Sequence, residues 1–289
     1  MPVDYIDWDV AYLLGLIVGR SKIIENDKFF IVIITFPFQS PDIEGYQQFE
    51  GFVSSISTRI YPRIRKLIGN HVDLKFDKDN NIAELHLIFE KESLIVRNFK
   101  LLLGPNYRNY ALLEVPQIIR GIDDIQIVEE FLRGFCDVSA NIRRSNRDIN
   151  GLHRVYVDIL NKNWILPVQL CELFQDKLNI PVANIMWGHP NMGRDFREHQ
   201  IRIYAHEFIK LGFYIDHKQA ALKILAEENG KFNPKHGDFC KGSRKRYLKK
   251  ALSSLENDPR IPEKIRGKHF NVYWEICAEF GCKKAKSKA

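Results

Sequence analysis

The stretch LLGLIVGRS (residues 13–21) decides the fold, because a related stretch, LRGFCDVSA, recurs at residues 132–140. Each copy reads as an apolar helix with glycine at its third position, and each runs into a segment typical of a β-strand. The copies lie roughly 120 residues apart, a period that favours two similar domains over a short-repeat solenoid.

The sequence around the two copies predicts the same order of elements twice. In the first half we expect a helix at 8–19 capped by Asp7 or Asp9, strands within 22–37, a helix at 43–67 interrupted at Pro62, strands at 72–76 and 82–89, and a helix at 93–103. After a connector at 105–125, the second half predicts a helix at 126–138, strands within 141–160, a helix at 164–178, strands at 182–187 and 199–204, and helical sequence at 205–228. Residues 29–34 are apolar on both strand faces, which predicts that both faces are covered.

Both stretches resemble degenerate LAGLIDADG motifs, the helix signature of the LAGLIDADG homing endonucleases and their relatives. The resemblance implies an α+β fold in which tandem pseudo-twofold αββαββα repeats form a saddle, with the two motif helices packed side by side. It places one repeat at 1–120 and the other at 121–228, and it leaves 229–289 as a small basic helical C-terminal extension. In the family, carboxylates at the eighth motif position meet around divalent metal at the scissile phosphates.

The eighth position holds the wrong residue types for that chemistry in this chain, because Arg20 and Ser139 occupy it. Metal-assisted hydrolysis of a phosphodiester needs carboxylates to hold the ion, whereas arginine cannot ligate magnesium and serine is a weak neutral ligand. Asp137, at the sixth position, is a candidate remnant ligand, but we favour a helix-end acid with a local partner. We therefore expect no catalytic residue of the family type, and Arg20 is suited to clamping a phosphate.

Basic and amide side chains gather on the strands that would line the saddle and read base edges and phosphates. The candidate DNA-binding residues of the second half are Asn141, Arg143, Arg144, Asn146, Arg147, Arg154, Arg194, Arg197, Gln200 and Arg202. The first half offers Lys22, Lys28 and Lys75, and nearby acids dilute their charge. The alternative is a solvated hairpin face, which explains many charge runs.

Composition narrows the class of partner. The formal net charge is +7, which favours a polyanion over a membrane or an acidic protein. Five cysteines without a framework-like spacing fit a reducing compartment. No stretch reaches about 18 uninterrupted apolar residues, and the N-terminus does not read as a secretory signal. We expect an intracellular protein, cytoplasmic or nucleoid-associated, with no membrane partner.

The C-terminal sequence is basic and holds scattered cysteine and histidine. Within the run 241–250, Arg244, Lys245 and Arg246 are candidates for additional phosphate contacts, although a solubilising surface or interaction tail explains them nearly as well. The potential zinc ligands are His236, Cys240, His269, Cys277 and Cys282. Their spacing fits no standard finger or ribbon, so we expect no zinc and no other cofactor.

The sequence predicts a sequence-specific double-stranded DNA-binding protein on an inactive homing-endonuclease scaffold, a pseudo-enzyme. It would serve as a transcription regulator or as the target-recognition component of a DNA-processing or defence system. Two alternatives stay open: an active DNA endonuclease with an atypical Mg²⁺ site, and an RNA-binding maturase-like splicing factor that binds structured RNA. A duplicated chain needs no dimer to form a twofold site, so we expect a monomer.

Overall fold

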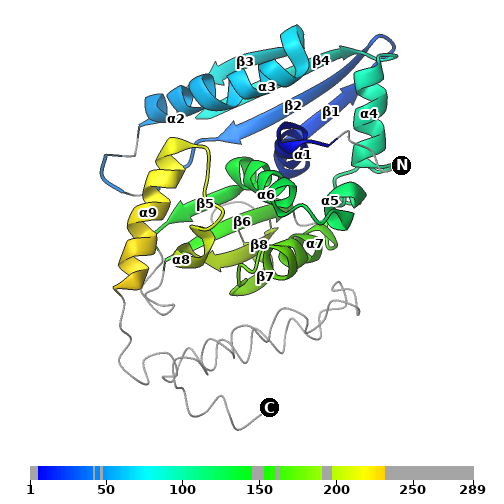
Figure 1. The fold of residues 1–289 in the computed structure, drawn as a ribbon. Coiled ribbons are helices and arrows are strands. Elements are labelled where there is room, and N and C mark those ends of the chain that lie inside the picture. Colours follow the sequence, from blue (N-terminus) through cyan, green and yellow to red (C-terminus); the bar gives the residue numbers. More distant parts are fainter. Residues whose placement is uncertain are drawn as a thin grey trace.

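The computed structural model describes residues 6–41, 43–45, 48–144, 153–160, 163–190 and 197–231 (Figure 1). The predicted basic extension, its candidate phosphate contacts and all five potential zinc ligands lie outside these residues.

The first half contains the predicted helix, strand pair, helix, strand pair and helix. Its elements are α1 (Trp8–Arg20), β1 (Ser21–Glu25), β2 (Phe29–Pro37), α2 (Phe49–Ser55), the π-helical turn η1 (Ile56–Ile60), α3 (Tyr61–Ile68), the 3₁₀ turn η2 (Gly69–His71), β3 (Val72–Asp77), β4 (Ile82–Glu90) and α4 (Leu94–Leu103). Asp7 caps α1 as predicted, since its side chain accepts a hydrogen bond from the Val10 amide at 2.8 Å.

The second half repeats this order after a connector that contains the short helix α5 (Gln117–Gly121). Its elements are α6 (Ile125–Ser139), β5 (Ala140–Arg143), β6 (Arg154–Leu160), α7 (Leu166–Glu172), the π-helical turn η3 (Leu173–Lys177), β7 (Asn184–Pro190), β8 (Arg197–Tyr204), α8 (Ala205–Phe208) and α9 (Asp216–Gly230). The π-helical turns η1 and η3 fall at corresponding places in the two halves.

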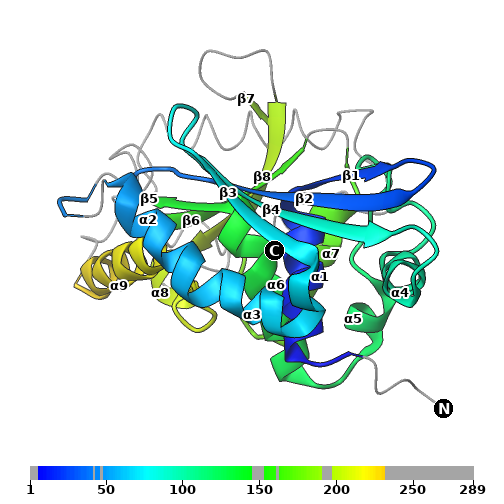
Figure 2. The same ribbon diagram turned by 90° about the horizontal axis from the view of Figure 1, so that it is seen from above.

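Each half folds into a four-stranded antiparallel sheet with the same topology. The strand orders are β1-β2-β4-β3 and β5-β6-β8-β7. Figure 2 shows both sheets along one side of the molecule, with α1 and α6 on the other side. The structure therefore confirms the α+β class and the pseudo-twofold pair of repeats.

The two motif helices meet through glycine. A Cβ atom on Gly15 would overlap the backbone carbonyl of Phe131, and one on Gly134 would overlap the carbonyl of Tyr12. The two helices also approach closely at Gly19, where an added Cβ atom would lie 3.0 Å from the Phe135 carbonyl oxygen. The third motif position must be glycine in both halves, since any side chain there would push the helix backbones apart.

Two sequence predictions differ from the structure. The helix predicted at 43–67 begins at Phe49, and Pro62 does not end it, because the π-helical turn before it places Pro62 in the first turn of α3. The prediction that both faces of 29–34 are covered is wrong. Val32 is buried, whereas Ile31 and Ile33 are partly exposed, because helices cover only one face of this antiparallel sheet.

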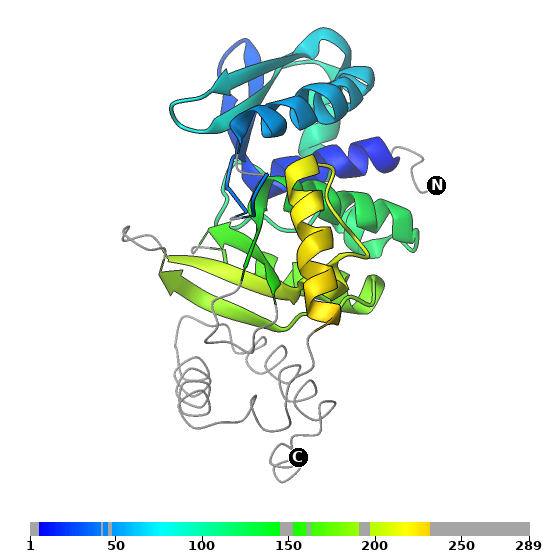
Figure 3. The same cartoon turned by 90° about the vertical axis from the view of Figure 1, so that its left-hand side faces the viewer.

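Helix α9 joins the second half to the first (Figure 3). At its N-terminus Asp216 pairs with Arg59 at 2.9 Å and accepts a hydrogen bond from the Ser55 hydroxyl at 3.3 Å. The ring of His217 packs between Phe38 and Phe52 of the first half. None of the helices in the described ranges has the length and apolar character needed to span a bilayer.

Candidate nucleic-acid interface

The seam between α1 and α6 ends where the two sheets begin, and there the eighth motif residues lie. Ser139 is buried, and its hydroxyl donates a hydrogen bond to the Gly19 carbonyl at 2.9 Å. Arg20 is half-buried at the end of α1 and makes no ion pair with any residue that the structure describes. At the two equivalent positions, the guanidinium of Arg20 therefore has no ion-pair partner among the described residues, and the hydroxyl of Ser139 is already hydrogen-bonded.

Asp137 is a fully buried part of the seam. Its carboxylate accepts hydrogen bonds from the Tyr12 hydroxyl at 2.7 Å and from the Tyr214 amide at 3.2 Å. Burial raises the pKa of Asp137 to about 6, and the hydrogen bond from Tyr12 offsets part of that rise. This geometry supports the interpretation of Asp137 as a helix-end acid with local partners.

Lys218 closes the C-terminal end of α6. Its ammonium group donates to the carbonyl oxygens of Asp137 and Ala140, both at 2.7 Å. A cation at a helix C-terminus satisfies carbonyls that have no helical partner and interacts favourably with the helix dipole. Burial lowers the pKa of Lys218 to about 8, while the nearby Asp137 charge opposes that shift.

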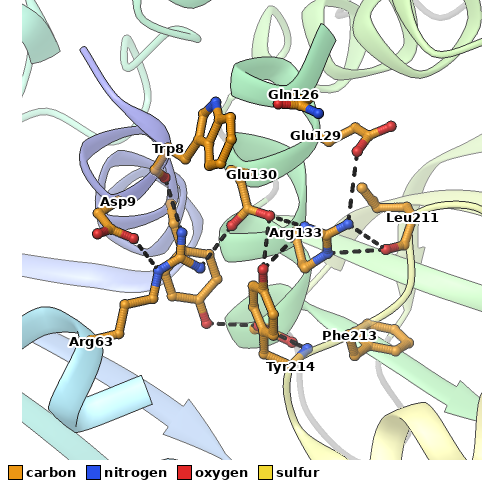
Figure 4. A network of polar contacts seen from close by, with 12 residues as sticks. Trp8, Asp9, Arg63, Gln126, Glu129, Glu130, Arg133, Leu211, Phe213 and Tyr214 are labelled. Carbon is orange, nitrogen blue, oxygen red and sulfur yellow. Dashed lines mark hydrogen bonds and ion pairs between the residues drawn. The ribbon is translucent and has the colours of Figure 1, made fainter. Parts of the chain in front are cut away.

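A polar network clamps the opposite ends of the motif helices (Figure 4). Arg63, from α3, bonds Asp9 at 2.6 Å in the first half and Glu130 at 2.7 Å in the second. Its guanidinium lies 4.4 Å from the centre of the Tyr12 ring and 5.1 Å from that of Tyr214. This network fixes the register of the two halves at the end of the seam remote from the sheets.

The outer face of each sheet is the face turned away from α1 and α6. Pairing across β5, β6 and β8 places five of the candidate DNA-binding residues on the outer face of the second sheet: Asn141, Arg143, Arg154, Gln200 and Arg202. Their neighbours in the same strands, such as Ile142, Val155 and Ile201, face the core. The strand alternation that the sequence suggested therefore holds in this sheet.

Aromatic rings lie next to the guanidinium groups of the arginines on this face and hold them in position. The guanidinium carbons of Arg143 and Arg202 lie 5.3 and 5.5 Å from the centre of the Tyr156 ring. Arg154 lies 5.1 Å from the Tyr204 ring, and its Nε has no hydrogen-bond partner among the described residues. Stacking of this kind holds a guanidinium in place.

Exposure differs sharply along this face. Arg154, Gln200 and Arg202 are only 1, 5 and 7% exposed, whereas Arg143 is exposed. Gln200 links the layer, because it donates to Asp158 at 2.8 Å and accepts from Arg202 at 2.9 Å. Burial raises the pKa of Asp158 to about 6, and the Gln200 hydrogen bond opposes that rise.

The outer face of the first sheet has a different chemistry. Lys22 and Lys75 lie there and are exposed. Isoleucines and acids surround them: Ile24, Ile31, Ile33, Ile88, Asp73 and Glu84. Lys28 lies in the turn between β1 and β2.

Other candidates are either engaged elsewhere or not described. Arg144 is exposed and forms a two-point ion pair with Glu228, at 2.7 and 3.1 Å, so its charge is already partnered. Arg197 begins β8, and its side chain is not described. The candidates outside the described residues are Asn146, Arg147, Arg194, Arg244, Lys245 and Arg246.

The sequence reasoning missed Tyr156, Asp158 and Tyr204 as members of this face. A signal was present, because Tyr156 and Asp158 alternate with Arg154 along β6 and therefore share its face. It also missed Lys218, which lies far along the chain from the carbonyls that it bonds.

The residues at the family's metal position do not fit a divalent ion. Arg20 would repel it, and the hydroxyl of Ser139 is already used within the seam. The Asp137 carboxylate is fully buried and bonded to two donors. Among the described residues, no group of three His, Cys, Asp or Glu side chains is placed to hold a metal ion.

The duplicated αββαββα order, the identical sheet topologies and the glycine-mediated contact of the motif helices decide the fold. The chain has a LAGLIDADG-like fold. Solved structures with this likeness include the homing endonuclease I-DmoI in complex with DNA and calcium, at 17% identity and a TM-score of 0.44, covering 75% of this chain and 97% of that one. I-SmaMI bound to uncleaved DNA target in the presence of calcium ions is similar at 10% identity and a TM-score of 0.35, covering 93% of this chain and 98% of that one. No protein-family profile matches the chain, and neither does any curated protein.

Proposed function

We propose that this LAGLIDADG-like chain is a sequence-specific double-stranded DNA-binding protein that does not cleave its target. In this proposal one chain binds one duplex, because the pseudo-twofold pair of sheets is built within a single polypeptide. Its role is that of an intracellular transcription regulator or of a target-recognition component for a partner enzyme.

The observation that carries the proposal is the ordered polar layer on the outer face of the second sheet. Arginine, glutamine and asparagine on antiparallel strands supply the donors that read base edges and bind phosphates. Arg143 is exposed and makes the first contacts. Arg154, Gln200 and Arg202 lie on the same face and are almost fully buried, and Arg202 shares the Tyr156 ring with Arg143.

The absence of cleavage is supported by the two eighth-position residues. Metal-assisted hydrolysis of a phosphodiester requires carboxylates that hold the metal ions at the scissile phosphates. Arg20 and Ser139 supply none, and Asp137 is enclosed by Tyr12 and the Tyr214 amide.

Selection of bound sequences from a random duplex library tests this proposal, with structured RNA present as competitor. Enrichment of one DNA sequence that RNA does not displace is the expected result. The enriched site should span roughly 15–25 base pairs, the length that two sheets cover over about two helical turns. Preferential binding to the RNA would support the maturase-like alternative, and no enrichment would overturn sequence-specific DNA recognition.

A further inference from the structure

The centre of the pseudo-twofold site is asymmetric. Arg20 ends α1 in the first half, and its counterpart at the end of α6 is Ser139. The hydroxyl of Ser139 is turned into the seam, where it bonds the Gly19 carbonyl. Only the first half therefore presents a charged side chain at this position.

Arg20 acts electrostatically on the second half. Burial raises the pKa of Asp158, on β6, and the nearby Glu198 adds to that rise. The hydrogen bond from Gln200 and the positive charges of Arg20 and of Arg143, on β5, act against it. Two guanidinium groups from opposite halves thus lie within electrostatic range of one carboxyl.

Lys218, a cation that interacts electrostatically with Arg20, is already engaged. Lys218 donates from its buried ammonium group to the carbonyls of Asp137 and Ala140. Arg20, in contrast, makes no ion pair with the described residues, so its donors remain available. An arginine in this condition matches a phosphate group, which accepts two parallel hydrogen bonds from the guanidinium fork.

We propose that Arg20 binds a backbone phosphate of one DNA strand at the centre of the saddle. The inference rests on the proposed DNA binding and adds to it a specific contact and a strand asymmetry. Arg20 neutralises phosphate charge on a single strand, because its counterpart Ser139 carries no charge and bonds within the seam.

The first test compares Arg20→Gln and Arg20→Lys with the matched control Arg97→Gln. Arg97 is an exposed arginine on α4, away from the outer faces of both sheets. The dissociation constant for a random-sequence duplex pool is measured by fluorescence anisotropy at several salt concentrations. Losing one phosphate contact should reduce the slope of log affinity against log salt by about 0.9 and weaken binding for all sequences alike. Arg20→Lys should keep most of the slope, and Arg97→Gln should match the wild type.

The second test locates the contact. Neutral methylphosphonate linkages are placed singly along each strand of a duplex of about 30 base pairs that carries the selected sequence. The wild type should lose affinity at one central linkage on one strand, and Arg20→Gln should show no such loss there.

The outcomes separate this inference from the proposed function. If the wild type binds duplex DNA but Arg20→Gln has the same affinity and salt slope, the phosphate contact is wrong and DNA binding stands. Equal central losses on both strands would also contradict the single-strand contact. If the wild type does not bind duplex DNA, the proposed function and this inference both fail.

Discussion

The two halves share one topology but carry opposite chemistry on their outer faces. In the first sheet, pairing aligns Ile24, Ile31 and Ile88 across three strands. The corresponding row of the second sheet is Arg143, Arg154 and Tyr204. Isoleucine in one half takes the place of stacked arginine in the other.

The adjoining row of outer-face residues also differs between the two sheets. Lys22, Ile33, His86 and Asp73 align in the first half, and Asn141, Tyr156, Arg202 and Asn184 align in the second. The core faces of both sheets stay apolar, because each must pack against helices. The outer faces carry no such constraint, so a duplicated fold can keep its architecture while the arginines stacked on tyrosine occur on the outer face of only one of its two described sheets.

The largest expected effect concerns what the halves share, the glycine seam. Gly15→Ala and Gly134→Ala should each lower the free energy of unfolding by about 3 kcal/mol, because each new Cβ overlaps a backbone carbonyl of the other helix. Gly51→Ala is the control, since nothing lies within 4 Å of its Cβ position in α2. Urea unfolding measures all three. Wild-type stability in both seam variants would contradict the close approach of α1 and α6.

The next effect concerns the sixth motif position, where the first half has Val18 and the second has Asp137. Burial raises the pKa of Asp137 from 3.8 to about 6 in the folded state. Stability from this group is therefore fully present below pH 3.8 and is lost as the pH rises through 6. The loss is on the order of 2–3 kcal/mol.

Asp137→Asn removes that titration and keeps a side chain that can accept hydrogen bonds from Tyr12 and Tyr214. Urea unfolding from pH 4 to pH 8 should therefore show a smaller fall in stability for the variant than for the wild type. Asp158→Asn serves as the comparison, because burial raises the pKa of Asp158 in the same direction on the outer face. An Asp137→Asn curve that parallels the wild type would argue against this account of Asp137.

A smaller effect tests the difference between the outer faces directly. Arg143→Ile copies the first-half residue Ile24 into the second half and should weaken DNA binding by about tenfold. The reciprocal change, Ile24→Arg, adds a cation to the isoleucine row and should strengthen binding. Titration of labelled duplex at constant salt measures both. Equal losses in the two variants would indicate that the halves bind DNA in the same way.

The smallest effect is expected on the first sheet itself. Lys75→Ala should change duplex affinity within about twofold, because Lys75 pairs across the strands with Glu84 and its row carries no stacked arginine. Lys22→Ala, nearer the start of β1, is the companion variant. If Lys75→Ala weakened duplex binding as much as Arg143→Ile does, the proposed difference in DNA binding between the two outer faces would be wrong.

Local signals were sufficient for much of the fold. Asp7 caps α1, and the paired glycines Gly15 and Gly134 set the seam, because both act through nearby backbone and through a motif that repeats. The error at Ile31 and Ile33 has a simple cause. An apolar run does not reveal whether helices cover one face of a sheet or both.

The candidate site was predicted less completely, because it depends on contacts between distant segments. Arg154 and Arg202 were identified from charge, but their stacking on Tyr204 and Tyr156 requires the register of β6 and β8. The ion pair of Arg63 with Glu130 joins the two halves, and no local pattern specifies it.

The central claim, binding without cleavage, is tested most directly by incubating the protein with its selected duplex in Mg²⁺ or Mn²⁺. Both strands are then separated on a denaturing gel. Intact strands, at protein concentrations that saturate the duplex, are the result that Arg20, Ser139 and the enclosed Asp137 predict. A metal-dependent nick or double-strand break at the centre of the site would contradict it and would mean that other residues hold the metal.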